Sequence, residues 1–279
     1  MMQRISIKTR EIDPEKYLGN YAQASDVSTV IDEDVVVEVD GVVVLAYVAS
    51  VGEDIEELRG MLNEHKFGVA QRASSKKAFY SASAVFGYQP RLPLRTVTQN
   101  CRIASLVRSN KELHSLLVAW TDAATRVYRE LAPDAASHHT EQTANKILEE
   151  YRIPRSMFTS GIVNKSNQLP YHYDSGNFVG AWSAMLGLSK GVSGGFLNIP
   201  EYDIALKISD GSLSFFDGQS RLHGVTPFTR NDATAERYTI VWYSLRKLWD
   251  CLPYREELAH VNQRMTEQNR MKAKKGKSK

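Results

Sequence analysis

Apolar residues recur along the first half of the chain with the spacings of both strands and helices. Two runs of valine, Val35-Val36-Val37 and Val42-Val43-Val44, flank Asp40-Gly41. This arrangement predicts a β-hairpin, because Asp-Gly adopts the tight turn that joins two β-branched strands. Apolar residues over Lys111–Leu131 recur every three or four positions and predict a helix that ends before Pro133.

Weaker patterns surround this helix. Glu53–Glu64 and Thr140–Tyr151 are predicted as shorter helices, the second ending before Pro154. The segment Arg72–Arg108 is rich in Ser, Pro, aromatic and basic residues and shows no clear period. It is therefore predicted to consist of loops with short strands.

The pattern changes at Met157, where short apolar runs begin to alternate with Gly, Asn, Asp and Pro. Many short strands at close spacing are typical of a β-sandwich or barrel. We therefore predict an α+β fold with three parts: strands, loops and helices over 1–154, a jelly-roll core over 155–250, and a helix with a basic tail over 251–279. The predicted core strands are Phe158–Val163, Ala181–Leu188, Gly195–Ile199, Ala205–Ile208, Ser212–Phe216 and Tyr238–Leu245.

Composition narrows the protein class. No apolar run is long enough to span a membrane, and the polar Met1–Arg10 segment predicts that no signal peptide is present. The two cysteines, Cys101 and Cys251, match no metal-binding spacing and are too few for a disulfide framework, so a reducing, cytoplasmic compartment is predicted. Arg270–Lys279 carries six basic residues and no acid, which fits either a solvated tail or a polyanion contact.

A candidate metal site lies in the predicted core. In the triplet His172-Tyr173-Asp174, strand alternation places the imidazole and the carboxylate on the same face. His223 follows about fifty residues later and supplies a second imidazole. Two histidines and one carboxylate form the facial triad that suits Fe(II) and leaves coordination positions open. The alternative is a surface His-x-Asp without metal; the remaining five histidines lie in no comparable context.

An arginine adds a second type of chemistry. Arg237 begins a predicted strand fourteen residues after His223, and its planar guanidinium can hold a carboxylate with two hydrogen bonds. The alternative is an ion pair with a neighbouring acid such as Glu236. Gly194-Gly195 and Asp210-Gly211 supply tight turns between the strands. The ordered set of His-x-Asp, Gly-Gly, Asp-Gly, His and Arg is more specific than any of its parts.

These motifs resemble those of the TET/JBP family of Fe(II)- and 2-oxoglutarate-dependent DNA base dioxygenases. The resemblance covers residues 155–250, and two earlier segments are similar to the smaller, phage-type members. The matching segments are Tyr171-His-Tyr-Asp-Ser-Gly-Asn177, Gly194-Gly-Phe-Leu-Asn-Ile-Pro-Glu-Tyr202, Asp210-Gly-Ser-Leu-Ser-Phe-Phe-Asp217, His223-Gly-Val-Thr-Pro227 and Arg237-Tyr-Thr-Ile-Val-Trp-Tyr243, with Phe86-Gly-Tyr-Gln-Pro-Arg91 and Phe158-Thr-Ser-Gly-Ile-Val-Asn164 before them.

The resemblance implies a cupin-like double-stranded β-helix with N-terminal helices packed on it, and cofactors Fe(II), 2-oxoglutarate and O2. It implies that His172, Asp174 and His223 bind iron and that Arg237 binds the distal carboxylate of 2-oxoglutarate. Asn177 matches a position that contacts the target base, although it also fits a simple turn. One departure concerns the base: the histidine that animal members have near the end of the arginine strand is absent from Tyr243-Ser-Leu245. Their cysteine-rich DNA-clamping region is also missing.

The expected reaction is oxidation of 5-methylcytosine in DNA to 5-hydroxymethylcytosine, with further oxidation left open. The base would be flipped out of the duplex or single-stranded, because a methyl group inside a duplex cannot reach a buried metal. The alternatives are hydroxylation of thymine in DNA, oxidation of a small molecule or protein side chain, and a non-catalytic cupin-type binding module. Candidate phosphate contacts are Arg91, Arg95, Arg102 and Arg108, and candidate stacking residues are Tyr80, Phe86 and Tyr88. Oligomeric state and source are not predicted, although a phage origin would fit.

Overall fold

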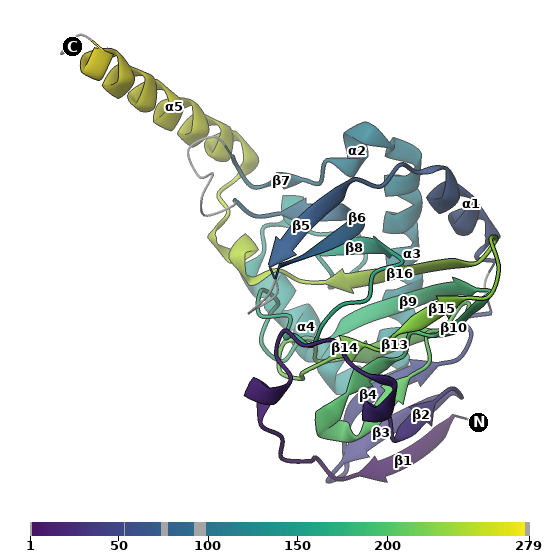
Figure 1. The fold of residues 1–279 in the computed structure, drawn as a ribbon. Helices are drawn as coiled ribbons and strands as arrows, with labels where there is room; N and C mark the ends of the chain where they lie inside the picture. The colour runs from purple at the N-terminus through teal and green to yellow at the C-terminus, as the bar shows by residue number, and fades with distance from the viewer. Residues whose placement is uncertain (1, 53, 74–77, 92–98, 277–279) are drawn as a thin grey trace.

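The fold is built on one large, twisted sheet (Figure 1). The computed structural model describes residues 2–52, 54–73, 78–91 and 99–276 of the chain. Along the sheet the strands are ordered β1 (Gln3–Ile7), β3 (Val35–Val39), β4 (Val42–Val48), β13 (Leu213–Phe216), β9 (Ser183–Lys190), β16 (Glu236–Tyr243), β8 (Ser160–Lys165), β6 (Ala78–Gln89) and β5 (Val69–Ala73). The short strand β7 (Arg102–Ile103) pairs with the end of β6.

A smaller sheet faces part of the large one and completes the jelly roll. Its order is β14 (Gly224–Val225), β11 (Leu197–Ile199), β12 (Ile204–Leu206) and β2 (Thr29–Ile31). A separate two-stranded antiparallel sheet pairs β10 (Val192–Gly194) with β15 (Phe228–Arg230). Side chains such as Leu45, Tyr47 and Phe216 from the large sheet pack against Ile199 and Leu206 from the small one. The predicted α+β class with a jelly-roll core is confirmed.

Helices cover the other face of the large sheet. They are α1 (Glu56–Glu64), α2 (Leu106–Ser109), α3 (Lys111–Leu131) and α4 (Pro133–Lys146), while α5 (Tyr254–Gly276) projects from the body (Figure 1). Helix α3 begins where predicted, because the Asn110 side chain accepts the Leu113 N–H, and it ends before Pro133. Short 3₁₀ turns are η1 (Pro14–Lys16), η2 (Ala24–Asp26), η4 (Glu149–Tyr151), η5 (Pro200–Tyr202) and η6 (Arg246–Asp250).

Strand β16 shows how alternation divides the molecule into a packed face and a cavity face. Tyr238, Ile240 and Trp242 point toward the helices and join Leu117 and Tyr128 of α3 in the main hydrophobic core. The intervening residues line a cavity between the two sheets, and they are Arg237, Thr239, Val241 and Tyr243. One strand therefore fixes the core and the site at the same time.

Two predictions from the first half of the chain are wrong in their details. Arg72–Arg108 contains the twelve-residue strand β6, which its many Ser and Ala residues conceal because they interrupt the apolar alternation. The helix predicted over Thr140–Tyr151 is instead α4, which starts at Pro133 and ends at Lys146. Pro133 occupies the first turn, where its missing N–H breaks no helical hydrogen bond. None of the described helices is both long and apolar enough to cross a membrane.

The two cysteines also differ from expectation. Cys101 and Cys251 are 150 residues apart in sequence but form a buried disulfide. The prediction of a reducing compartment assumed that they stay apart, whereas the loop after β6 and the segment before α5 meet in the fold. Glu257, fully buried beside them, accepts hydrogen bonds from the Cys101 and Leu252 N–H groups and forms an ion pair with Arg91.

Removal of this disulfide should destabilise the protein. Replacement of both cysteines by Ser is expected to lower the free energy of unfolding by about 2–4 kcal/mol, because the bond restricts a long loop in the unfolded chain. Urea denaturation of the oxidised protein measures the difference. As a control, the variant and the wild type are compared under a thiol reductant, where both lack the disulfide. If the difference in the free energy of unfolding persists, the loss comes from packing and not from the bond.

A buried histidine predicts how stability depends on pH. His139 is fully buried among Tyr128, Phe158 and Phe178, and its Nε2 lies 2.7 Å from Ser244 Oγ. Burial lowers the pKa of His139 to about 3. Because the folded-state pKa lies below that of the unfolded chain, this contribution to stability is complete above about pH 6.5 and is lost as pH falls below it.

Below about pH 6, the free energy of unfolding should fall by about 1.4 kcal/mol per pH unit because of His139. In His139→Phe this contribution to the pH dependence is expected to disappear, because the phenyl ring takes up no proton on unfolding. Urea denaturation at several pH values between 7.5 and 4.5 measures it. His260→Gln, on an exposed part of α5, is the matched control, and equal slopes for wild type and His139→Phe would contradict the assignment.

Candidate active site

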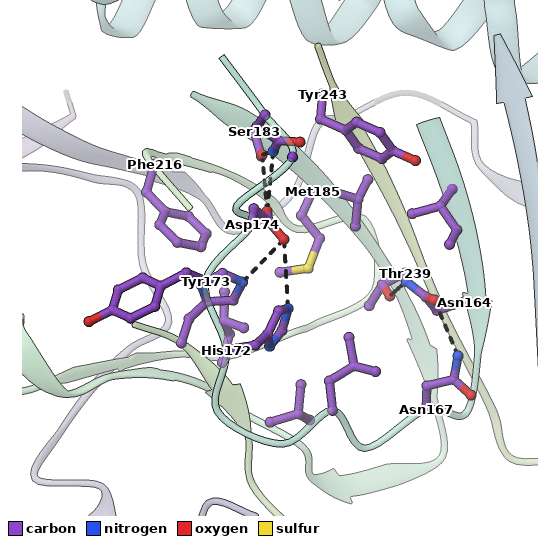
Figure 2. Close-up of a pocket in the computed structure, with 18 of the residues that line it drawn as sticks. Asn164, Asn167, His172, Tyr173, Asp174, Ser183, Met185, Phe216, Thr239 and Tyr243 are labelled. Atoms are coloured by element: carbon purple, nitrogen blue, oxygen red, sulfur yellow. Dashed lines mark hydrogen bonds and ion pairs between the residues drawn. The ribbon is translucent and has the colours of Figure 1, made fainter. Parts of the chain in front are cut away.

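A cavity of about 350 Å³ lies between the two sheets, which is within the range of small-molecule sites. The large sheet contributes β8, β9 and β16, and the small sheet contributes Leu197 and Val225. All four residues predicted to carry the chemistry, His172, Asp174, His223 and Arg237, line this cavity. Figure 2 shows His172 and Asp174 on one side of it and Asn164, Asn167 and Thr239 on the other.

The three predicted metal ligands converge. One donor atom from each of His172, Asp174 and His223 can be chosen so that all lie within 4.8 Å of one another. Asp174 Oδ1 is 3.7 Å from His172 Nε2 and 4.0 Å from His223 Nε2. This spacing allows one ion to contact all three donors after small side-chain movements.

The backbone holds the two histidines side by side. His172 and His223 form an isolated antiparallel bridge, in which each N–H donates to the carbonyl of the other, at 2.9 and 3.1 Å. Their Nδ1 atoms lie 2.8 Å from Pro170 O and 2.9 Å from Arg221 O. Donation from Nδ1–H to a carbonyl would fix the tautomer and leave the Nε2 lone pair available to a metal ion.

Electrostatics and close packing fit the same role. Burial, together with neighbouring His172, lowers the pKa of His223, so the imidazole is neutral and available to a cation. Asp174 Oδ2 receives weak contacts from Asn177 Nδ2 at 3.4 Å and Ser183 Oγ at 3.5 Å. A Cβ atom on Gly218 would lie 2.7 Å from this oxygen, so only glycine leaves the carboxylate its space.

Arg237 is a buried cation at the far end of the cavity. It is 2% exposed, and its Nη1 and Nη2 donate to the carbonyls of Asn167 at 3.3 Å and Gly195 at 3.1 Å. Burial lowers its pKa to about 10, which still leaves it charged at neutral pH. Among the residues that the structure describes, no carboxylate forms an ion pair with it, and its buried Nε has no hydrogen-bond partner.

The alternative ion pair with Glu236 is excluded by geometry. Glu236 points to the other side of β16, where it binds Arg59 and Asn63. A buried guanidinium without an acidic partner is costly unless an anion joins it. The donor set at one end of the cavity, and at the other a cation with no acidic partner among the described residues, therefore fit Fe(II) and a dicarboxylic co-substrate.

Asn177 has a defined place beside the predicted metal ligands. It is 6% exposed, and its Nδ2 donates to Ser183 Oγ at 3.1 Å and lies 3.4 Å from Asp174 Oδ2. The side chain lines the cavity, so contact with a substrate and orientation of Asp174 are both compatible with its position.

Sequence reasoning missed a polar network on the wall near Arg237. Asn167 Nδ2 donates to Ser81 Oγ at 2.8 Å and to Asn164 Oδ1 at 3.2 Å, and Asn164 Nδ2 lies 3.4 Å from Thr239 Oγ1. Alternation along β16 from Arg237 would have identified Thr239 and Tyr243 as cavity residues. Nothing in the sequence signals Asn167, which reaches the site from the turn after β8.

Only some of the residues predicted to contact nucleic acid are exposed and not engaged by other side chains. Arg91 is engaged by Glu257 and the Asp250 carbonyl, so it is a poor candidate for phosphate, whereas Arg108 is exposed. Arg102 is half-buried and donates to Asn100 O, and Arg95 lies outside the described residues. Of the aromatic candidates, Phe86 is fully buried and Tyr88 packs on Tyr151, which leaves Tyr80 as the exposed ring.

Comparison with known proteins agrees with this geometry. The profile of the Tet_JBP family, described as the oxygenase domain of the 2OGFeDO superfamily, matches residues 93–246, more than half of the chain. The bifunctional helicase and thymine dioxygenase JBP2 of Trypanosoma brucei brucei (strain 927/4 GUTat10.1) is 26% identical over 243 residues. That match covers 82% of this chain and 21% of the relative, so the chain spans about a fifth of its length.

A solved structure shares the architecture. NgTET1 in complex with 5mC DNA superimposes with a TM-score of 0.58 and 14% identity, over 84% of this chain and 85% of that chain. At this sequence identity the similarity shows a shared fold only, so the assignment to a family rests on the profile match. The chain belongs to the Tet_JBP family of 2OGFeDO oxygenase domains, whose cofactors are Fe(II), 2-oxoglutarate and O2.

Proposed function

We propose that this protein is an Fe(II)- and 2-oxoglutarate-dependent dioxygenase that oxidises the 5-methyl group of 5-methylcytosine in DNA. The observation that carries the proposal is the pairing, in one cavity, of a two-histidine, one-carboxylate cluster with a buried arginine that has no acidic partner among the described residues. Family membership and the likeness to NgTET1 bound to 5mC DNA support the substrate class.

In this proposal each residue has one task. His172, Asp174 and His223 would hold the iron, and Arg237 would bind the far carboxylate of 2-oxoglutarate with its guanidinium. Fe(II), 2-oxoglutarate and O2 together supply an oxidant able to hydroxylate a methyl C–H bond. Phe216, Met185, Val241 and Ile162 form apolar walls that exclude water from the site.

The protein itself must position the base. Asn177 lines the cavity next to Asp174, and its amide can both donate and accept a hydrogen bond. A base that reaches the cavity must leave the duplex, because His223 and Arg237 are buried within the fold and His172 and Asp174 are only partly exposed. Selection between bases would then depend on hydrogen bonds at the base edge, each worth about a ten- to hundredfold preference.

Thymine in DNA is the second candidate. It is favoured by the similarity to a protein named as a thymine dioxygenase and by the missing histidine at the end of β16. The two candidates require the same iron chemistry and differ only in contacts with the base edge.

The test is a competition on one duplex. Purified protein with Fe(II), 2-oxoglutarate and O2 is incubated with DNA that contains both 5-methylcytosine and thymine, and nucleosides are quantified by mass spectrometry. Hydroxymethyl product from 5-methylcytosine, with succinate in equal amount, is the expected result. Product from thymine alone would move the protein to the second candidate, and succinate without any modified nucleoside would exclude both bases.

A further inference from the structure

The surface beside the cavity mouth has an unusual combination of exposed apolar and basic side chains. Among the described residues that line the cavity, Ser175 and Gly176 are the exposed ones, so the cavity opens on their side. The Gly176 carbonyl accepts the Arg246 N–H at 3.0 Å, which brings η6 to this opening. We define the rim as Val179, Arg246, Lys247, Trp249 and Lys146.

Val179 occupies a rigid position at the rim. Its carbonyl accepts a hydrogen bond from Gln142 Nε2 at 2.9 Å, and the N–H of the preceding Phe178 donates to Ser244 O at 3.0 Å. The Phe178 ring is fully buried and packs on His139 and Trp249, at centroid distances of 5.8 and 5.3 Å. The backbone is therefore fixed from both sides, yet the Val179 side chain is 56% exposed.

Cations lie on the elements that hold this segment, because the neighbouring Phe178 packs on Trp249 of η6, which also carries Arg246 and Lys247. Lys146 Nζ lies 5.8 Å from the centre of the Trp249 ring, which is itself 36% exposed. Arg246 and Lys247 are exposed, and within the described part of the chain neither is paired with a carboxylate. The rim thus presents an apolar side chain on a rigid backbone, near cations and a deep cavity. Such a surface is complementary to duplex DNA from which one base is flipped out.

We propose that the rim holds duplex DNA open: Val179 occupies the space that the flipped base leaves, while Arg246 and Lys247 contact the flanking phosphates. This inference rests on the proposed function and adds the means by which a base in a duplex reaches the cavity. A single strand needs no opening, so the contribution of Val179 is specific to duplex substrate. The cations act on both forms, because both carry phosphates.

The experiment compares one target sequence as duplex and as single strand. Val179→Ala removes two methyl groups from the tip and is expected to lower kcat/KM on the duplex about tenfold, with a change of about twofold or less on the single strand. Val179→Ile keeps the apolar volume and should retain duplex activity. Val42→Ala is the matched control, because Val42 is also a well-exposed valine, at 64%, but begins β4 in the N-terminal hairpin.

A second measurement does not depend on turnover. A duplex with 2-aminopurine at the target position fluoresces more strongly when that base is unstacked, and Val179→Ala should reduce the increase caused by wild-type protein. Arg246→Gln with Lys247→Gln should lower the salt dependence of duplex binding by about two counterions.

The outcomes separate the two proposals. Equal loss on duplex and single strand, or no loss relative to Val42→Ala, would overturn the role of Val179. If wild-type protein oxidises neither form, the proposed function fails, and the 2-aminopurine signal still decides the inference. An increase in that signal that depends on Val179 supports the rim as a duplex-opening surface, and an unchanged signal with wild-type protein overturns it.

Discussion

Asp174→Ala is expected to abolish turnover while leaving the fold intact. The carboxylate is the charged member of the proposed ligand set, and its Oδ1 lies 3.7 and 4.0 Å from the two imidazole Nε2 atoms. Loss of a residue that merely orients a ligand typically costs ten- to a hundredfold in metal affinity, so loss of the ligand itself should lower activity by at least about a hundredfold. Its hydrogen bonds, at 3.4 and 3.5 Å, are weak, and the metal-free protein should lose about 1 kcal/mol of stability or less.

Two measurements check this expectation. Succinate formation reports turnover, and thermal denaturation with and without Fe(II) or Ni(II) under anaerobic conditions reports binding of the ion. The matched control is Asp32→Ala, which removes an exposed carboxylate paired with Lys207 at 3.5 Å. A metal-dependent rise in melting temperature that survives in Asp174→Ala would show that the ion binds elsewhere.

Arg237→Lys is expected to raise the KM for 2-oxoglutarate about ten- to a hundredfold, the second large effect. Lysine retains a positive charge but cannot present two parallel N–H donors to a carboxylate. It would also leave the carbonyls of Gly195 and Asn167 without the hydrogen bonds that Arg237 now donates. Loss of one hydrogen bond to a charged group accounts for the predicted range.

The measurement is the rate of succinate formation as a function of 2-oxoglutarate concentration. Arg230→Lys provides the control, because Arg230 lies at the end of β15 and donates to Ser166 in an exposed position. Its KM should equal that of the wild type. If Arg237→Lys also leaves the KM unchanged, another residue binds the distal carboxylate, and the polar network of Asn164, Asn167 and Thr239 would be examined first.

Local sequence patterns were sufficient to predict α3 and six of the nine strands between residues 155 and 250, but not β10, β14 and β15. The β3–β4 hairpin followed from Asp40-Gly41, whose positive φ angles of 51° and 78° suit the turn. The helix before the core starts at Pro133, seven residues before the predicted Thr140. The sequence does not locate this start, because a proline can follow the end of one helix or occupy the first turn of the next. Strand β6 was missed, since its burial comes from pairing with β8, a contact distant in sequence.

The same distinction between local patterns and long-range contacts applies to the residues of the site. His172 and Asp174 are close in sequence, and His223 and Arg237 follow at spacings that a known family shares. All four could therefore be predicted as site residues, and they line one cavity. The disulfide, the engagement of Arg91 by Glu257 and the Asn164–Asn167 network depend on contacts between residues far apart along the chain. Such contacts leave no local pattern in a single sequence.

The backbone bridge between His172 and His223 has a consequence for metal supply. Two N–H···O bonds join the backbones of these residues, so their relative position does not depend on an ion. Removal of the metal by a chelator should therefore be reversible by simple ion exchange, without refolding. The same rigidity admits competitors, since divalent ions later in the first-row series bind nitrogen and oxygen donors more tightly than Fe(II). Occupancy in a cell would then follow the relative availability of these ions, and inactive metals such as Zn(II) would act as inhibitors by occupying a ready-made position.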